Sequence, residues 1–286
     1  MPPALTVFGG TGDDTLQTSS FAFTASEREA IFFSSSIETI VDTEGTFHSD
    51  PNAIVLTEGA DVLALTADDD TVKGNALTLN PGDDLDGGEG FDSLVLFGGG
   101  TFNLNALAGF ANFEKVEVVN VSTTPVTLTL RDGTTSDVTL GGSTFTSQIN
   151  LSGTASAGTI QGGAGRDTMT LSGNASATTI LGGDGFDTVM LSGNASVTTI
   201  DVGNDSTFSG QLVRLADAAS ATIIQGGSSS DTVQLLSSGS ANVTTINLGA
   251  QFDTIFVGST SAWNPNIAID AGTDSDQLVF SSSGQT

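Results

Sequence analysis

The sequence predicts an all-β protein, a parallel β-roll or β-helix solenoid with coils of about 20 residues. Two consecutive units, GTIQGGAGRDTMTLSGNASA (158–177) and TTILGGDGFDTVMLSGNASV (178–197), match in phase without a gap. Short runs of Val, Ile, Leu and Thr alternate with turns, and the chain has 36 glycines. Glycine at this frequency is unfavourable in helices but suits turns between short strands.

Each unit contains two apolar runs, such as 179–181 and 188–191, and each run is followed by a turn. Stacked coils bury these side chains in one continuous core, which a single coil cannot form. An antiparallel sandwich is the alternative, because it also spaces short strands by 8–12 residues. The in-phase repeat favours the solenoid.

Further units extend the repeat on both sides. The unit after residue 197 aligns Gln211 with Asp187, and the next three carry Asp231, Asp253 and Asp276. The unit upstream places Thr146 at the Asp position. We therefore expect a solenoid of about seven coils over residues 138–286, a rod roughly 30–35 Å long at about 4.8 Å per strand.

Residues 1–137 are predicted to be a separate, less regular β-rich region. The Gly- and Asp-rich motif recurs at 7–17 and 80–100. Residues 18–60 are a possible cap or insertion. The segments 26–42 and 107–120 each indicate a short helical turn that leads into a strand. The boundary is placed near residue 137.

Composition restricts the possible partners. The chain has 33 Asp and Glu against 6 Lys and Arg, a net charge of -27, which disfavours nucleic acid and attracts cations. A hydrophobic fraction of 37% argues against disorder. No apolar stretch approaches about 20 residues, so no transmembrane insertion is expected. The N-terminus lacks a basic segment, so we expect no cleaved signal peptide.

The Gly-Gly-x-Gly-x-Asp turns predict calcium binding. Glycine permits positive φ, which leaves carbonyl oxygens facing into the turn, and the Asp adds a carboxylate. Two such turns, one coil apart, can surround Ca²⁺ with about six hard oxygens. The expected ligand positions are Gly162, Gly163, Gly165, Asp167, Gly182, Gly183, Asp184, Gly185 and Asp187, with further sites at Asp13, Asp14, Asp92 and Asp231. The alternative is that these aspartates only cap turns through Asx-type hydrogen bonds.

The motif resembles the nonapeptide of RTX (repeats-in-toxin) proteins, and the chain is similar in style to calcium-dependent S-layer proteins and RTX adhesins. The resemblance implies an extracellular or cell-surface protein exported by a type I system. The chain departs from the family in its period of 20 to 24 residues and in its second turn, Ser-Gly-Asn-Ala-Ser. Asn174 and Asn194 in that turn are expected to form a hydrogen-bonded ladder.

We expect a calcium-stabilised structural protein that binds copies of itself and assembles into a surface layer, filament or matrix, with cell-surface polysaccharide as a possible partner. An enzyme is not expected, because the single histidine, His48, lies in a loop sequence. The alternatives are an adhesin module, a β-helix polysaccharide-active enzyme, and an ice-binding module. The ice-binding alternative depends on Thr-Thr-Ile, which recurs at 178–180, 198–200 and 244–246.

Overall fold

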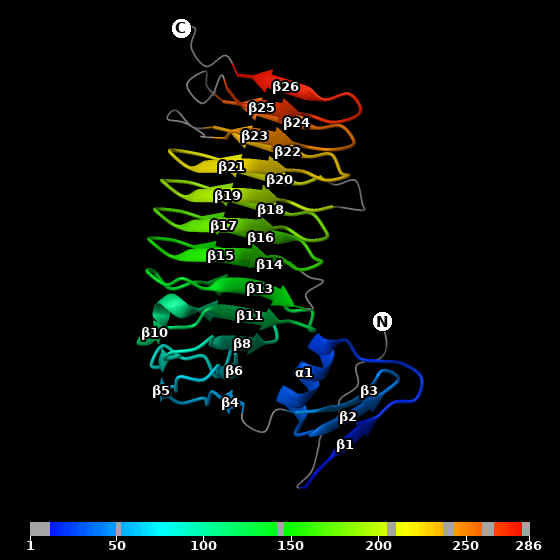
Figure 1. The fold of residues 1–286 in the computed structure, drawn as a ribbon, viewed down its shortest axis with the longest axis vertical. Coiled ribbons are helices and arrows are strands. Elements are labelled where there is room, and N and C mark those ends of the chain that lie inside the picture. The colour runs from blue at the N-terminus through cyan, green and yellow to red at the C-terminus, as the bar shows by residue number, and fades with distance from the viewer. Residues whose placement is uncertain are drawn as a thin grey trace.

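The fold consists of short parallel strands stacked coil upon coil. A computed structural model describes residues 12–49, 53–141, 146–204, 210–236, 243–258 and 266–281. They form an all-β parallel solenoid of about 11 turns with about 22 residues per coil (Figure 1). The predicted fold class is confirmed.

One sheet, the long sheet, runs the whole length of the solenoid. Within the described residues it has eleven strands, and each strand pairs in parallel with the equivalent strand one coil away. The strands are β4 (Ile54–Val55), β6 (Thr71–Asn75), β8 (Ser93–Phe97), β11 (Lys115–Val119), β13 (Asp137–Gly141), β15 (Ser156–Gln161), β17 (Ser176–Leu181), β19 (Ser196–Asp201), β21 (Ser220–Gln225), β23 (Thr245–Asn247) and β25 (Ala268–Asp270).

A second parallel sheet, the facing sheet, lies opposite the long sheet but begins several coils later (Figure 1). Its nine strands in the described chain are β9 (Gly100–Asn103), β12 (Val126–Thr129), β14 (Ser147–Leu151), β16 (Asp167–Leu171), β18 (Thr188–Leu191), β20 (Leu212–Leu215), β22 (Thr232–Leu235), β24 (Thr254–Val257) and β26 (Gln277–Phe280).

The first coils use a third sheet, the short sheet. It contains the parallel strands β5 (Val62–Ala64), β7 (Asp84–Asp86) and β10 (Gly109–Ala111). A single 3-10 turn, η1 (Leu104–Ala106), precedes β10. The helical turn expected at the start of segment 107–120 is wrong, because residues 109–111 add a strand to the short sheet.

Apolar side chains form columns along the solenoid axis. In the long sheet Ile160, Ile180 and Ile200 pair with one another and have no exposed surface. In the facing sheet Leu171 and Leu191 pair in the same way and are buried. Each coil therefore covers the apolar side chains of the coil before it, and the columns make one continuous core.

The parallel ladder continues through the predicted boundary. β11 pairs in register with β13, so the long sheet has no break near residue 137. The register also corrects one position of the repeat: Ser147, not Thr146, lies beside Asp167. The pairing of Thr188 with Leu212 places Gln211 in the Asp column, as the sequence predicts.

Residues before β4 form a small module beside the solenoid (Figure 1). It consists of β1 (Thr15–Gln17), α1 (Ala25–Ser35), β2 (Thr39–Asp42) and β3 (Gly45–His48), with β1 parallel and β3 antiparallel to β2. Thr24 and Glu27 form a capping box that starts α1. Buried Arg28 pairs with Asp42 at 2.9 Å and with Glu44 at 2.7 Å.

The helix of this module packs on the outer face of the long sheet. Phe33 stacks on Phe97 of β8 with ring centroids 4.4 Å apart. Lys73 Nζ of β6 lies 3.0 Å from Glu29 Oε2. Among the described residues, no helix is long and apolar enough to cross a membrane.

Candidate functional site

The Gly-Gly-x-Gly-x-Asp turns are shaped by the close approach of neighbouring coils. A Cβ on Gly182 would lie less than 3.0 Å from the carbonyl oxygen of Val202 and from Asp187 Oδ2. Gly183 has φ +104°, and a Cβ there would lie less than 3.0 Å from the carbonyl oxygen of Gly163. Gly182 and Gly183 are therefore required by stacking, independently of any ligand.

The motif aspartates form a hydrogen-bonded column, which we call the carboxylate ladder. The backbone N–H of Asp167 donates to Asp187 Oδ1 at 2.9 Å, and that of Asp231 donates to Asp253 Oδ1 at 2.7 Å. Asp253 N–H donates in turn to Asp276 Oδ1 at 3.0 Å. Each carboxylate thus accepts a hydrogen bond from the backbone N–H of the equivalent Asp one coil earlier in the chain.

Gln211 continues the carboxylate ladder as a neutral member. Its Oε1 accepts the N–H of Asp187, and its own N–H donates to Asp231 Oδ1 at 3.0 Å. Its Nε2 donates to the carbonyl oxygen of Gly185 at 2.6 Å. An amide can therefore fill the column, and here it also engages a carbonyl that a cation could otherwise use.

The same hydrogen bond recurs at other corners of the molecule. Asp70 N–H donates to Asp92 Oδ1 at 2.8 Å, and Asp92 N–H donates to Glu114 Oε2 at 2.7 Å, at the turn before the long sheet. In the N-terminal module, Asp14 N–H donates to Glu38 Oε2 at 2.7 Å. In each of these pairs a carboxylate accepts the N–H of the residue just before the adjacent parallel strand.

Some carboxylates of the ladder also close their own turn. Asp167 Oδ2 accepts the N–H of Gly163 at 2.7 Å, and Asp231 Oδ2 accepts that of Gly227 at 3.0 Å. In both turns the donor lies four residues before the Asp, so the bond differs from the Asx-type cap, in which the side chain accepts an N–H two residues further on. At Asp253 the turn has changed, with Gln251 at φ +80°, and Oδ2 makes no hydrogen bond within the described chain.

Burial raises the pKa of these carboxyls. Asp167 and Asp253 have no exposed surface, and loss of water raises the pKa of Asp167 to about 6 and that of Asp253 to about 7. At Asp253 the negative charges of Asp231, Asp276 and Asp274 add to this effect. Burial likewise raises the pKa of Asp92. The charged forms of Asp167 and Asp253 therefore cost stability at neutral pH.

The predicted calcium residues lie in several places. The turns 162–167 and 182–187 are adjacent, as expected, but Asp184 is exposed and bridges to Asn204. Asp13 is exposed, and Gly9 and Gly10 lie outside the described residues. Asp92 precedes a strand of the long sheet, whereas Asp187 and Asp231 precede strands of the facing sheet and Asp167 begins β16 of that sheet. The metal positions therefore belong to more than one corner.

The chemistry of these residues fits calcium. Asp92 keeps one buried oxygen, Oδ2, that makes no hydrogen bond with the described chain, and a cation there would compensate its charge. Carboxylate and carbonyl oxygens are the ligands that Ca²⁺ takes. In the described ranges, no three acidic or histidine side chains gather as a metal cluster, so main-chain carbonyls would supply the remaining ligands. Gln211 already engages the carbonyl of Gly185, one of the expected ligands, so a cation between the turns 162–167 and 182–187 would rely on the carboxylates and the other carbonyls.

The opposite turn holds the predicted asparagine ladder. Asn194 Nδ2 donates to Asn174 Oδ1 at 3.0 Å, which confirms that prediction. Gly173 and Gly193, with φ +70° and +66°, turn the chain just before these asparagines.

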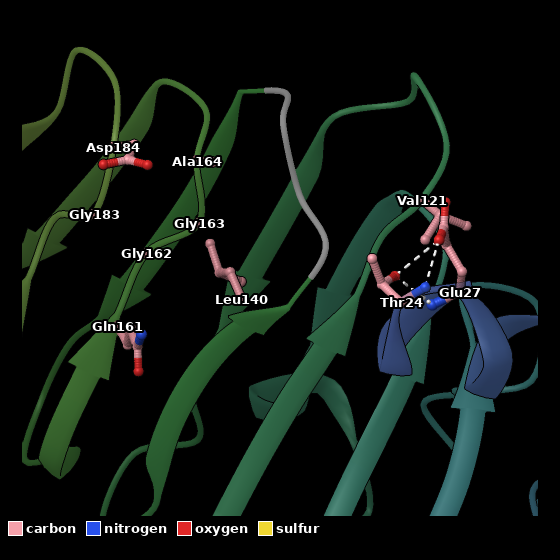
Figure 2. A pocket seen from close by; sticks show the side chains of 10 residues that line it. All are labelled: Thr24, Glu27, Val121, Leu140, Gln161, Gly162, Gly163, Ala164, Gly183 and Asp184. Atoms are coloured by element: carbon pink, nitrogen blue, oxygen red, sulfur yellow. Dashed lines mark hydrogen bonds between the residues drawn. The ribbon is translucent and has the colours of Figure 1, made fainter. Parts of the chain in front are cut away.

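A shallow groove runs between α1 and the solenoid turns (Figure 2). Its charged lining residues in the described chain are Glu27 and Asp184, which lie at opposite ends of the groove in Figure 2. Glu27 Oε2 is held by the N–H of Thr24 at 2.8 Å. Because the carboxylates of Glu27 and Asp184 lie apart, they do not form a pair that could act together on one substrate bond.

Comparisons of the chain with models of known families, with curated proteins and with solved structures gave no significant match.

Proposed function

We propose that the protein is a structural rod that associates with copies of itself through the ends of its solenoid, at a cell surface or in an extracellular matrix. The observation that carries this proposal is the stacking itself: each coil covers the apolar core columns of its neighbour, so a coil of another chain could continue them. Leu278 and Phe280 pair with Ile255 and Val257, which are 2% and 0% exposed. Leu278 and Phe280 themselves are 46% and 50% exposed.

The place of β26 in the fold supports association. In every earlier coil of the facing sheet, the same columns are covered by the coil that follows. The strand β26 is also an edge strand, and exposed edges pair readily with strands of other chains. An apolar layer beside an open edge is the surface that another coil would cover.

Calcium is the proposed stabiliser of the rod. Asp167 and Asp187, with carbonyl oxygens of the glycines in their turns, would hold the ion, and its charge would relieve the repulsion among buried carboxylates. This corresponds to the RTX-type assignment suggested by the motif. The charge of -27 on each chain opposes association, and divalent cations would screen it.

Sedimentation velocity over a range of protein concentrations tests the proposal, with calcium and with a chelator. The proposal predicts a concentration-dependent shift from monomer to larger species, at lower protein concentration when calcium is present. A single monomeric species at all concentrations in both buffers would exclude association. Association that is indifferent to calcium would remove the calcium part alone.

An ice-binding surface is the second candidate, favoured by threonines on the outer face of the long sheet. Thr179 and Thr199 pair directly, and the same column continues through Ile223 to Thr245. Thermal hysteresis measured on the purified protein tests this candidate. No hysteresis at millimolar protein would reject it.

A further inference from the structure

The outer face of the facing sheet carries almost no charge, although the chain as a whole has a net charge of -27. Side chains alternate between the core and the outside along a strand. From β9 to β24 the outward residues are Thr101, Asn103, Thr127, Thr129, Gln148, Asn150, Thr168, Thr170, Thr188, Met190, Leu212, Arg214, Thr232, Gln234, Thr254 and Phe256. Arg214 is the one charged residue among them. An outward column of the long sheet, by contrast, contains Glu117, Asp201 and Asp270.

Arg214 differs from the other cations of the chain. The other lysines and arginines have partners: carboxylates for Arg28, Lys73 and Lys115, main-chain carbonyls for Arg131, and the ring of Phe186 for Arg166. The side chain of Arg214 is exposed and makes no ion pair or hydrogen bond within the described residues. Its positive charge is therefore available to a partner.

The neighbours of Arg214 have the composition of a protein interface. Along one outward column, Met190 pairs with Arg214, Arg214 with Gln234, and Gln234 with Phe256. The three neighbours are all partly exposed. Arginine, methionine and aromatic residues are enriched in protein–protein interfaces, and aspartate and glutamate are depleted. We call these four residues, on β18, β20, β22 and β24, the lateral patch.

We propose that the lateral patch binds the lateral patch of a second copy, with the two facing sheets packed face to face and the two rods antiparallel. This inference rests on the proposed self-association and adds a contact along the sides of the rods to the contact between their ends. Charge and self-complementarity both select a copy of the same chain as the occupant.

The charge of the face favours the approach of a second acidic chain. Two chains of -27 repel each other most where carboxylates of both lie within about 8 Å, the screening distance at physiological ionic strength. A contact between two faces that carry no carboxylate on their strands avoids such pairs. A second copy can therefore approach the facing sheet at a lower electrostatic cost than the outer face of the long sheet.

The order of residues in the lateral patch is self-complementary. A two-fold axis parallel to the strands, midway between β20 and β22, makes an isologous contact. Arg214 then faces Gln234 of the second copy, and Met190 faces Phe256 of the second copy. The guanidinium can donate to the amide oxygen, and a thioether sulfur packs favourably on an aromatic ring. No like charges meet across the axis.

The contact is small. Four strands at about 4.8 Å, each four residues long at about 3.3 Å per residue, cover about 250 Å² of each copy. A standard interface covers about 800 Å² per partner. We therefore expect a weak, reversible contact that contributes when many rods lie side by side at high effective concentration.

Cross-linking of two different variants tests this arrangement, because the chain has no cysteine. Full-length Met190→Cys and Phe256→Cys, one with a tag that changes its mass, are treated with a short bis-maleimide reagent alone and as a mixture. The axis places position 190 of one copy beside position 256 of the other, and it keeps the two copies of either position three coils, about 14 Å, apart. We expect a dimer of mixed mass in the mixture and monomer for each variant alone.

A charge reversal tests the same contact by a second route. Arg214→Glu in both members of the pair places a carboxylate on each face and should lower the yield of the mixed dimer by about tenfold or more. Arg166→Glu makes the same change of charge at an exposed arginine in the turn before β16 and should leave the yield unchanged. Circular dichroism checks that each variant keeps its β structure. A mixed dimer that survives Arg214→Glu, or that Arg166→Glu reduces equally, would overturn the proposal.

The remaining outcomes separate this inference from the proposed function. If wild-type protein associates in sedimentation velocity but the mixture gives no mixed dimer, self-association stands and the lateral contact is wrong. Equal cross-linking of each variant alone and of the mixture would refute the two-fold arrangement. If Arg214→Glu loses binding to insoluble cellulose while association is unchanged, the face serves polysaccharide and not a second copy. If wild-type protein is monomeric at every concentration, the proposed self-association and this inference fail together.

Discussion

Replacing Asp253 by asparagine is expected to stabilise the protein above pH 7. The carboxyl of Asp253 is fully buried, and burial raises its pKa from 3.8 to about 7. The folded state therefore holds a proton that the unfolded state releases between these two pKa values. Stability should fall as pH rises from about 4 to about 7, and the whole cost is present above pH 7.

The magnitude follows from the size of the shift. A difference of about 3 pKa units at about 1.36 kcal/mol per unit sets an upper limit of about 4 kcal/mol on the cost of the charged form, because solvent screening reduces it. Asparagine keeps an oxygen to accept the N–H of Asp231 but buries an amide where Oδ2 makes no hydrogen bond with the described residues. That amide costs about 1–3 kcal/mol, so the expected net gain at pH 8 is at most about 3 kcal/mol.

Urea unfolding at pH 5 and pH 8 in the presence of a chelator measures this effect. Asp253→Asn should be more stable than wild type at pH 8 and equal or less stable at pH 5. Glu58→Gln, at an exposed position, removes one charge without changing the ladder and should change stability by less than about 0.5 kcal/mol. If Asp253→Asn and wild type lose stability in parallel between pH 5 and pH 8, the reasoning is refuted.

Three other substitutions test the turns and the ladder. Gly183→Ala should destabilise the protein by about 1–3 kcal/mol in urea unfolding, because φ is +104° and the carbonyl oxygen of Gly163 leaves no space for a Cβ; an unchanged midpoint would contradict the stacking explanation. Gln211→Asp should cost about 2 kcal/mol at pH 8 and less at pH 5, since it adds a buried charge and removes the bond to Gly185; a loss that is equal at both pH values would show that charge is not the cause. Asp187→Asn should weaken calcium binding in isothermal titration more than Asp253→Asn does; equal effects would place calcium elsewhere.

The repeat predicts the fold because stacking imposes it on the sequence. Ile160, Ile180 and Ile200 recur at the coil spacing, and this alone indicates which residues share a core column. The sequence alignment places Thr146 at the Asp position, whereas the structure places Ser147 there. Loose repeats contain loops of different length, so only the strand register fixes the alignment. The short sheet was not predicted because strands such as β10 have three residues and give almost no periodic signal.

The candidate site was predicted in composition but not in its hydrogen bonding. A carboxylate before a strand can face a cation in the turn or accept an N–H from the adjacent coil, and both arrangements use the same residues. The position of Asp187 in the sequence does not distinguish them. The clearest signal was Gln211, because an amide in the Asp column is compatible with a hydrogen-bonded ladder.

Small-angle X-ray scattering above the association concentration tests the central claim, a rod joined end to end, most directly. About 11 turns at about 4.8 Å make a solenoid about 50 Å long. The account predicts that the maximum dimension increases by about one solenoid length for each chain that joins. A particle with the dimensions of one chain at every concentration, or one that grows only in width, would contradict it.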